Sequence, residues 1–171
     1  MKKVQLISKT LFYITRLLGV LYFLMPLYSL VCLATGWSTT PYGNGAYMHI
    51  HYPFTEVPFL NIDNNIPYII FEFLLPLGLY GFFFWLTGNV FKAFYQPRLF
   101  TNFGVKQLRN FYLANLVIPL PALLLSSVFA ETDSIAFALV VVHSILGIFA
   151  YFMAVIFMQG VKLQNEQELF I

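Results

Sequence analysis

Residues Leu17 to Ala34 read LLGVLYFLMPLYSLVCLA, a run without a charged side chain. A helix needs about 20 residues, at a rise of about 1.5 Å each, to cross the roughly 30 Å of bilayer hydrocarbon. Open strands are excluded because lipid would leave their backbone groups unpaired. We therefore expect an all-α integral membrane protein that forms a single domain over residues 1–171. With three similar later segments, the run predicts four transmembrane helices at about 11–34, 68–94, 111–130 and 135–158.

The composition supports lipid as the solvent of this chain. It is 60% hydrophobic, 19% aromatic and 9% charged, which is too little charge for the surface of a soluble domain. The net charge of +2 does not indicate a nucleic-acid partner, since the basic residues flank apolar runs instead of clustering. The lone Cys32 excludes an internal disulfide and a multi-thiolate metal site, and we expect no cofactor.

All nine Lys and Arg residues flank the predicted spans on one side. Short loops that keep Lys and Arg stay in the cytoplasm, so both termini and the loop between helices two and three are expected there. The loop of about 30 residues between helices one and two is then extracytoplasmic. The very short third loop makes helices three and four antiparallel neighbours in a bundle. The basic residues are Lys2, Lys3, Lys9, Arg16, Lys92, Arg98, Lys106, Arg109 and Lys162.

The extracytoplasmic loop, roughly residues 35–67, is expected to be ordered but irregular. Apolar and polar residues alternate from Ala46 to Tyr52, which predicts a short strand or hairpin over the helix ends. His49 and His51 share one face of this strand and could bind a metal if a third ligand such as Glu56 approached. A bare His-x-His pattern is a weak signal, so the sequence assigns no metal site.

The third span is expected to begin and to bend at identifiable residues. Thr101 or Asn102 can cap a short interfacial helix that leads into this span. Pro119 and Pro121 predict a kink further along, where a freed carbonyl group meets Asn115 or a neighbour.

Two stretches carry motifs that resemble a known family. They resemble the "Pro-Phe, Asn, Val-Lys-x-Leu-Arg" and closing "Gly-x-x-Leu-Gln-x-Glu-x-Asp-Leu-Thr-Ile" stretches of an uncharacterised family of four-helix bacterial membrane proteins, known only as a domain of unknown function. The chain departs from the family at Leu99, Glu168 and Phe170, where Pro, Asp and Thr are usual. The stretches here are Leu99-Phe100, Asn102 and Val105-Lys106-Gln107-Leu108-Arg109, and then Gly160 to Ile171.

The resemblance implies a multi-pass protein of the bacterial cytoplasmic (inner) membrane and no particular activity. Members are often encoded beside a small helix-turn-helix regulator, an association that points to regulation without supplying a mechanism. Both motifs fall on the cytoplasmic side, one with Lys106 and Arg109 and the other with Glu166 and Glu168. The tail is therefore expected to dock on the loop. The alternative is solvated charges, worth about 0 to 1 kcal/mol per pair.

Three ionisable residues lie inside the predicted spans, where charge is costly and often functional. Arg16 lies near the cytoplasmic end of helix one, from which its head group can extend to water. Glu72 and His143 lie at similar depths near the outer ends of helices two and four. They are expected to form either a proton- or ligand-responsive pair or one buried hydrogen bond that holds the helices together.

Two local patterns turn Glu72 and His143 inward. Pro76 follows Glu72 by four residues and so frees the Glu72 carbonyl from its helical partner. His143 begins a stripe of small residues that lets helices approach closely, continuing through Gly147, Ala150 and Ala154.

No enzymatic motif is present. The chain lacks a nucleophile elbow, a phosphate-binding glycine loop and an HExxH pattern, so we do not expect an enzyme. We expect a regulatory or accessory protein that contacts a membrane or cytoplasmic protein through the loop-and-tail surface. The alternative is a small transporter or channel, assembled as a homo-oligomer, with Glu72 and His143 along its pathway.

Overall fold

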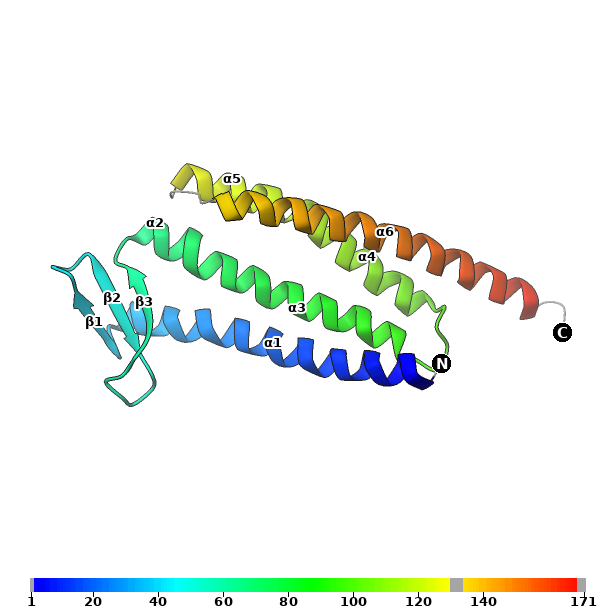
Figure 1. Cartoon of the computed structure of the whole chain (residues 1–171), viewed down its shortest axis with the longest axis horizontal. Coiled ribbons are helices and arrows are strands. Elements are labelled where there is room, and N and C mark those ends of the chain that lie inside the picture. The colour runs from blue at the N-terminus through cyan, green and yellow to red at the C-terminus, as the bar shows by residue number, and fades with distance from the viewer. Residues whose placement is uncertain (1, 130–133, 169–171) are drawn as a thin grey trace.

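The structure is a computed structural model that describes residues 2–129 and 134–168, with side chains as far as Gln167. Four helical segments of this described chain are long and apolar enough to cross a membrane, at residues 2–35, 66–94, 102–129 and 134–167. The expected number and order of apolar helices are thus confirmed (Figure 1). The elements are α1 (Lys2–Thr35), β1 (Thr39–Tyr42), β2 (Tyr47–His51), β3 (Pro58–Asp63), α2 (Ile66–Tyr68), the π-helix η1 (Ile69–Leu74), α3 (Leu75–Phe94), α4 (Asn102–Val117), α5 (Pro119–Phe129) and α6 (Ser134–Glu168).

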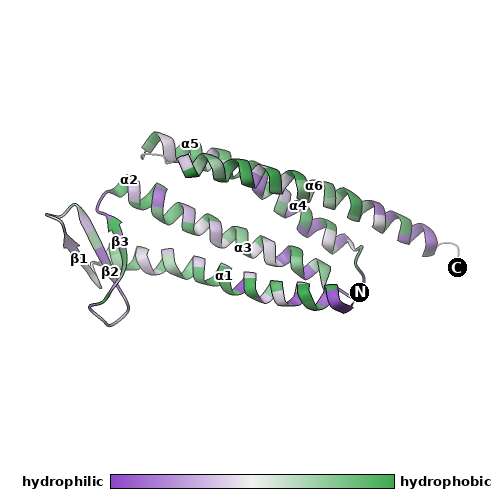
Figure 2. Cartoon of the chain, viewed as in Figure 1, coloured by the Kyte–Doolittle hydropathy of each residue, from purple (hydrophilic) through white to green (hydrophobic). Residues whose placement is uncertain are grey.

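The molecule has two unlike ends. The start of α1 and the last turns of α6 lie at one end, and the three strands lie at the other (Figure 1). We call the first the basic end, because the Lys and Arg residues gather there, and the second the sheet end. Apolar residues dominate the helices between them, and hydrophilic residues are concentrated toward the two ends (Figure 2).

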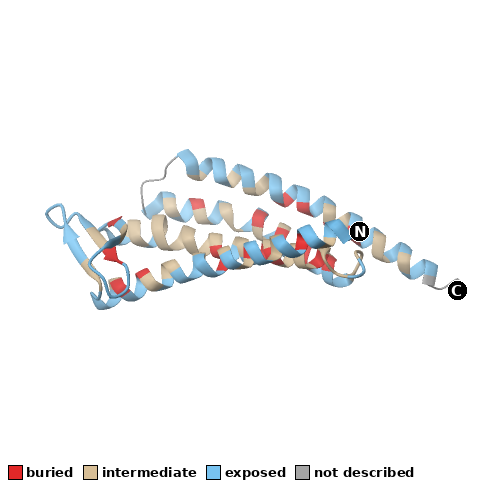
Figure 3. Ribbon diagram, turned by 60° about the horizontal axis from the view of Figure 1, so that its bottom comes forward, coloured by how far each residue is buried: buried red, intermediate tan, exposed pale blue. Residues whose placement is uncertain are grey.

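The helical segments follow one another across the molecule. α1 packs mainly on α3, α3 packs on α4, and α4 and α5 pack on α6. Neighbouring segments are antiparallel, as expected, but α1 and α6 lie at opposite margins, so the bundle is open (Figure 1). Buried residues lie between adjacent helices and beneath the sheet, while exposed residues run along the outer helix faces (Figure 3). Many of these exposed residues are large and apolar.

Two helices are longer than the sequence predicts. α1 begins at Lys2 instead of near residue 11, and α6 continues to Glu168 instead of ending near residue 158. The 34 residues of α1 correspond to about 51 Å, well beyond the hydrocarbon thickness. An apolar run marks only the part of a helix suited to lipid, whereas Lys, Gln and Glu are good helix formers that extend it into water.

A three-stranded antiparallel sheet in the order β1-β2-β3 replaces the expected irregular loop. The strand predicted over residues 46–52 is confirmed as β2, but its two partners contain prolines that concealed them. Proline is tolerated here because Pro41 lies on an edge strand and Pro58 is the first residue of β3. Ile50 and Ile62 are buried against Cys32 of α1, so the sheet is packed onto the helices.

The π-helix changes which carbonyl Pro76 leaves open. The Leu75 N–H donates to the carbonyl of Ile70, five residues back. In this register Pro76 lies opposite the Phe71 carbonyl and has no N–H to donate. The Ser126 hydroxyl of α5 donates to that carbonyl instead, at 3.2 Å. The expected opening at the Glu72 carbonyl is therefore displaced by one residue, because the sequence did not predict the π turn.

The third helical segment begins and breaks where expected. The Thr101 hydroxyl accepts a hydrogen bond from the Gly104 N–H at 3.0 Å, which confirms the predicted cap. The expected short helix and the span expected from about residue 111 form one continuous helix, since α4 runs without interruption from Asn102 to Val117. The segment then breaks, and α5 begins at Pro119.

The small-residue stripe of α6 brings it close to α4. A Cβ atom at Gly147 would lie 2.7 Å from the Leu116 side chain, so a larger residue there requires Leu116 to shift. Ala150 and Ala154 on the same stripe are also buried. The stripe is therefore confirmed as the surface on which α6 meets its neighbour.

Replacing Gly147 by Ala should destabilise the protein by about 1 kcal/mol or more, because overpacking outweighs the gain in helix propensity. The measurement is the unfolding free energy in mixed detergent micelles. Gly78→Ala is the matched control, since nothing lies within 4 Å of its added Cβ, and it should be neutral or stabilising. Equal stability of the two variants would contradict the close approach of α6 to α4.

Candidate functional site

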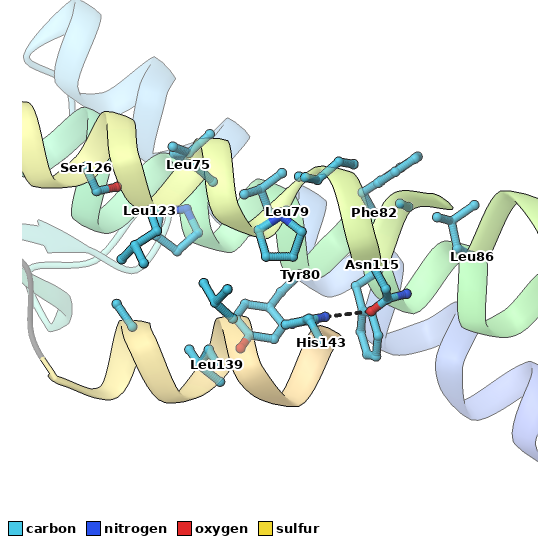
Figure 4. Close-up of a pocket in the computed structure, with 18 residues that line it drawn as sticks. Leu75, Leu79, Tyr80, Phe82, Leu86, Asn115, Leu123, Ser126, Leu139 and His143 are labelled. Atoms are coloured by element: carbon cyan, nitrogen blue, oxygen red, sulfur yellow. Dashed lines mark hydrogen bonds between the residues drawn. The ribbon is translucent and has the colours of Figure 1, made fainter. Parts of the chain in front are cut away.

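Asn115 and His143 form a polar pair between α4 and α6. Asn115 is 2% exposed, and its amide NH₂ group donates to the Phe111 carbonyl at 2.8 Å. This bond orients the amide so that its oxygen, Oδ1, faces His143 Nδ1 at 2.7 Å (Figure 4). Since Oδ1 can only accept, the hydrogen-bond network assigns the proton of the neutral ring to Nδ1. The other ring nitrogen, Nε2, is then an acceptor.

A cavity of about 150 Å³ lies beside this pair, between α3, α4, α5 and α6. Its walls are mostly apolar, with the polar side chains of Tyr80, Asn115, Ser126 and His143 among them (Figure 4). The Ser126 hydroxyl is engaged with the backbone of Phe71. No Lys, Arg, Asp or Glu belongs to the described walls, so the cavity suits an uncharged molecule.

The pocket expected around Glu72 and His143 has a different composition. Glu72 is half-buried on η1 and does not line the cavity, while His143 pairs with Asn115. The sequence predicts for Asn115 only a place beside the Pro119 kink. The packing of α4 against α6, rather than any local sequence pattern, brings Asn115 to His143.

Arg16 lies between α1 and α3 instead of extending to water. Its Nη2 group donates to Asn89 Oδ1 at 2.8 Å, and its guanidinium lies 3.6 Å from the centre of the Trp85 ring. Its Nη1 atom is buried and has no hydrogen-bond partner among the described residues. Arg16 therefore attaches α1 to α3. The planar guanidinium group of Arg is well suited to this contact, because it stacks favourably on an aromatic ring.

The two family-like stretches meet at the basic end, through rings and glycines. Phe100 and Phe157 are in edge-to-face contact, with centroids 5.4 Å apart. A Cβ at Gly160 would lie 2.5 Å from the Phe100 ring, and one at Gly104 would lie 3.1 Å from Phe157. These contacts place the last turns of α6 beside the start of α4.

The charges on these stretches are arranged differently from the expected docking. Lys106 and Arg109 are exposed on α4. Glu166 forms an ion pair at 3.8 Å with Lys162, one turn earlier on its own helix. The side chain of Glu168 lies outside the described residues. Aromatic packing rather than charge therefore carries the described contact between the two stretches.

The two histidines of β2 make local hydrogen bonds. The ring of His49 pairs with Asn61 Oδ1 and stacks on Tyr42, and His51 Nε2 lies 3.1 Å from Thr40 Oγ1. Across residues 2–129 and 134–168, no group of three His, Cys, Asp or Glu side chains is placed to hold a metal ion. Glu56 does not complete the suggested site.

No model of a known protein family matches this chain, and comparisons with curated proteins and with solved structures find no match either. The resemblance of residues 99–109 and 160–171 to a four-helix family therefore stays a prediction.

Replacing Asn115 and His143 by Ala, singly and together, should reveal a coupling of about 0.6 kcal/mol and at most about 1.7 kcal/mol. Each single change should cost about 1 to 3 kcal/mol, since it leaves a polar group unpaired. The measurement is the unfolding free energy in mixed micelles.

Glu72→Gln combined with His143→Ala provides the control. The two effects should add, because Glu72 does not line the cavity and His143 bonds to Asn115. Coupling of His143 to Glu72 instead of Asn115 would contradict the geometry described here and restore the pair expected from the sequence.

Proposed function

We propose that this chain is a multi-pass protein of a bacterial cytoplasmic membrane, acting as a regulatory or accessory subunit through protein contacts at its basic end. The four long apolar helices support insertion in a bilayer. The concentration of Lys and Arg at one end supports an orientation with that end in the cytoplasm. The sheet then lies on the opposite side of the membrane.

The observation that carries the proposal is the packing of Phe100 and Phe157 around Gly104 and Gly160. It fixes two charged elements side by side on a rigid support. Lys106 and Arg109 project from α4, and Lys162 and Glu166 from α6. We call these four residues the basic-end surface. Exposed charges with a fixed spacing select a partner of complementary charge.

A role as a transporter or channel is less well supported than a role in protein contacts. The described helices form an open row, and the cavity between them has apolar walls without a charged side chain. An oligomeric transporter or channel would need a polar pathway, and the proposed Glu72 and His143 do not share the cavity. Regulation through the basic-end surface needs only exposed, well-positioned charges.

Cysteine labelling tests the orientation. Lys106→Cys should react with a membrane-impermeant maleimide only after cells are opened, whereas Glu56→Cys, on the sheet end, should react in intact cells. Both residues are exposed. The native Cys32 is fully buried, so it should not react with the maleimide. The reverse pattern would place the basic end outside and overturn the proposed orientation.

Charge reversal tests the partner surface. A photo-reactive residue in place of the exposed Asn110 should crosslink a partner in native membranes. Lys106→Glu with Arg109→Glu should reduce that crosslink by about fivefold or more, since each lost contact is worth up to about 1 kcal/mol.

Lys2→Glu with Lys3→Glu is the control, because it makes the same charge change at the same end but on α1. It should leave the crosslink intact. An equal loss of the crosslink in both double variants would indicate an effect of membrane orientation or of overall charge instead of a specific surface. A crosslink only between copies of this chain would favour the oligomeric alternative.

A further inference from the structure

The Asn115 and His143 pair leaves one ring nitrogen available at the cavity. His143 Nδ1 is bonded to Asn115, whose other polar atom is held by the Phe111 carbonyl. Within residues 2–129 and 134–168, the Nε2 atom of His143 has no hydrogen-bond partner, and this atom is not fully buried. It is therefore an accessible acceptor on a cavity-lining side chain.

The cavity has the size of one aromatic ring. Its volume of about 150 Å³ is comparable to that of an engineered apolar protein cavity that stays dry and binds benzene. Leu75, Leu79, Leu123 and Leu139 supply aliphatic walls (Figure 4). The rings of Tyr80 and Phe83 flank His143. An aromatic body can therefore pack against aliphatic groups and rings together.

The cavity is reached from the apolar surface of the helices. Phe82 and Leu139 line it and are 39% and 36% exposed on segments suited to span a membrane. α6 begins at Ser134, at the sheet end of the molecule. His143 lies nine residues further along this helix, or about 14 Å from its start. A molecule that occupies the site has to arrive dissolved in hydrocarbon, so it must be uncharged.

We propose that this cavity binds a small, uncharged, lipid-soluble phenol, whose hydroxyl group donates a hydrogen bond to His143 Nε2. A hydroxyl in hydrocarbon has no water to pair with, so an accessible acceptor at this depth selects it over a plain hydrocarbon of the same shape. Asn115 acts as the positioning residue, because its oxygen holds the proton on Nδ1 and keeps Nε2 an acceptor. The cavity is separate from the basic-end surface, so binding of a phenol in the cavity does not depend on a partner at that surface.

The test uses the full chain in lipid nanodiscs, with 4-fluorophenol and fluorobenzene as probes followed by ¹⁹F NMR against empty nanodiscs. Fluorophenol should bind saturably and about fivefold to tenfold more tightly than fluorobenzene, the difference expected for one hydrogen bond. It should also shift the ¹⁵N resonance of His143 Nε2. Equal binding of the two probes, or no saturable binding above empty nanodiscs, would overturn the proposal.

Two variants on α6 provide matched controls. Ala136→Leu fills the cavity while leaving the Asn115 and His143 pair in place, and it should abolish saturable binding of fluorophenol. Ala138→Leu adds the same atoms two residues away, at an exposed position outside the walls, and should bind as the native chain does. Unchanged binding in Ala136→Leu, or equal loss in both, would show that the probe lies elsewhere.

His143→Phe tests the hydroxyl preference separately from the volume. It removes the acceptor, so the preference for fluorophenol over fluorobenzene should fall to about onefold even if some binding remains. If this variant does not fold, Ala136→Leu and the Nε2 shift still decide. A preference that survives in a folded His143→Phe protein would contradict the proposed hydrogen bond.

Discussion

In the proposed bilayer setting, polar groups inside the four apolar helices need partners within the protein, because hydrocarbon offers none. Pro76 removes a backbone donor, and the Phe71 carbonyl is satisfied by Ser126 from another helix. Asn115 Oδ1 and His143 Nδ1 pair between α4 and α6, and His143 Nε2 stays available at the cavity. Each of these bonds joins elements that are distant in sequence. The requirement for internal pairing thus also determines which helices lie together.

Glycine makes those bonds reachable by letting the helices approach. Gly147 lies against Leu116 and Asn115, directly after the turn that carries His143. Gly160 and Gly104 similarly accommodate the rings of Phe100 and Phe157 at the basic end. Toward the sheet end the side chains diverge and leave the cavity beside His143. α4 and α6 therefore take part in both the charged surface and the apolar pocket, whose other walls come from α3 and α5.

The candidate sites were only partly predictable. The sequence identified His143 and the small-residue stripe, because polarity inside an apolar run and a helical repeat are visible along the chain. It paired His143 with Glu72 because their depths are similar, but depth says nothing about which way each side chain points. The π turn at residues 69–74 and the order of the helix row decide that, and neither has a local signature. The Phe100 ring lies against Gly160, but Glu166 pairs with Lys162 of its own helix instead of with Lys106 or Arg109 as the expected docking requires.

By itself the sequence determined the number and order of the apolar helices, a cap at Thr101 or Asn102 and a kink near Pro119 and Pro121. Hydropathy, capping and the missing proline N–H are properties of a few neighbouring residues. Only the tertiary structure decided that Asn115 is the partner of His143, that Arg16 stacks on Trp85, and that β1 and β3 complete a sheet. These contacts join residues far apart in the chain. Their geometry depends on how whole helices rotate and pack, which no short window of residues encodes.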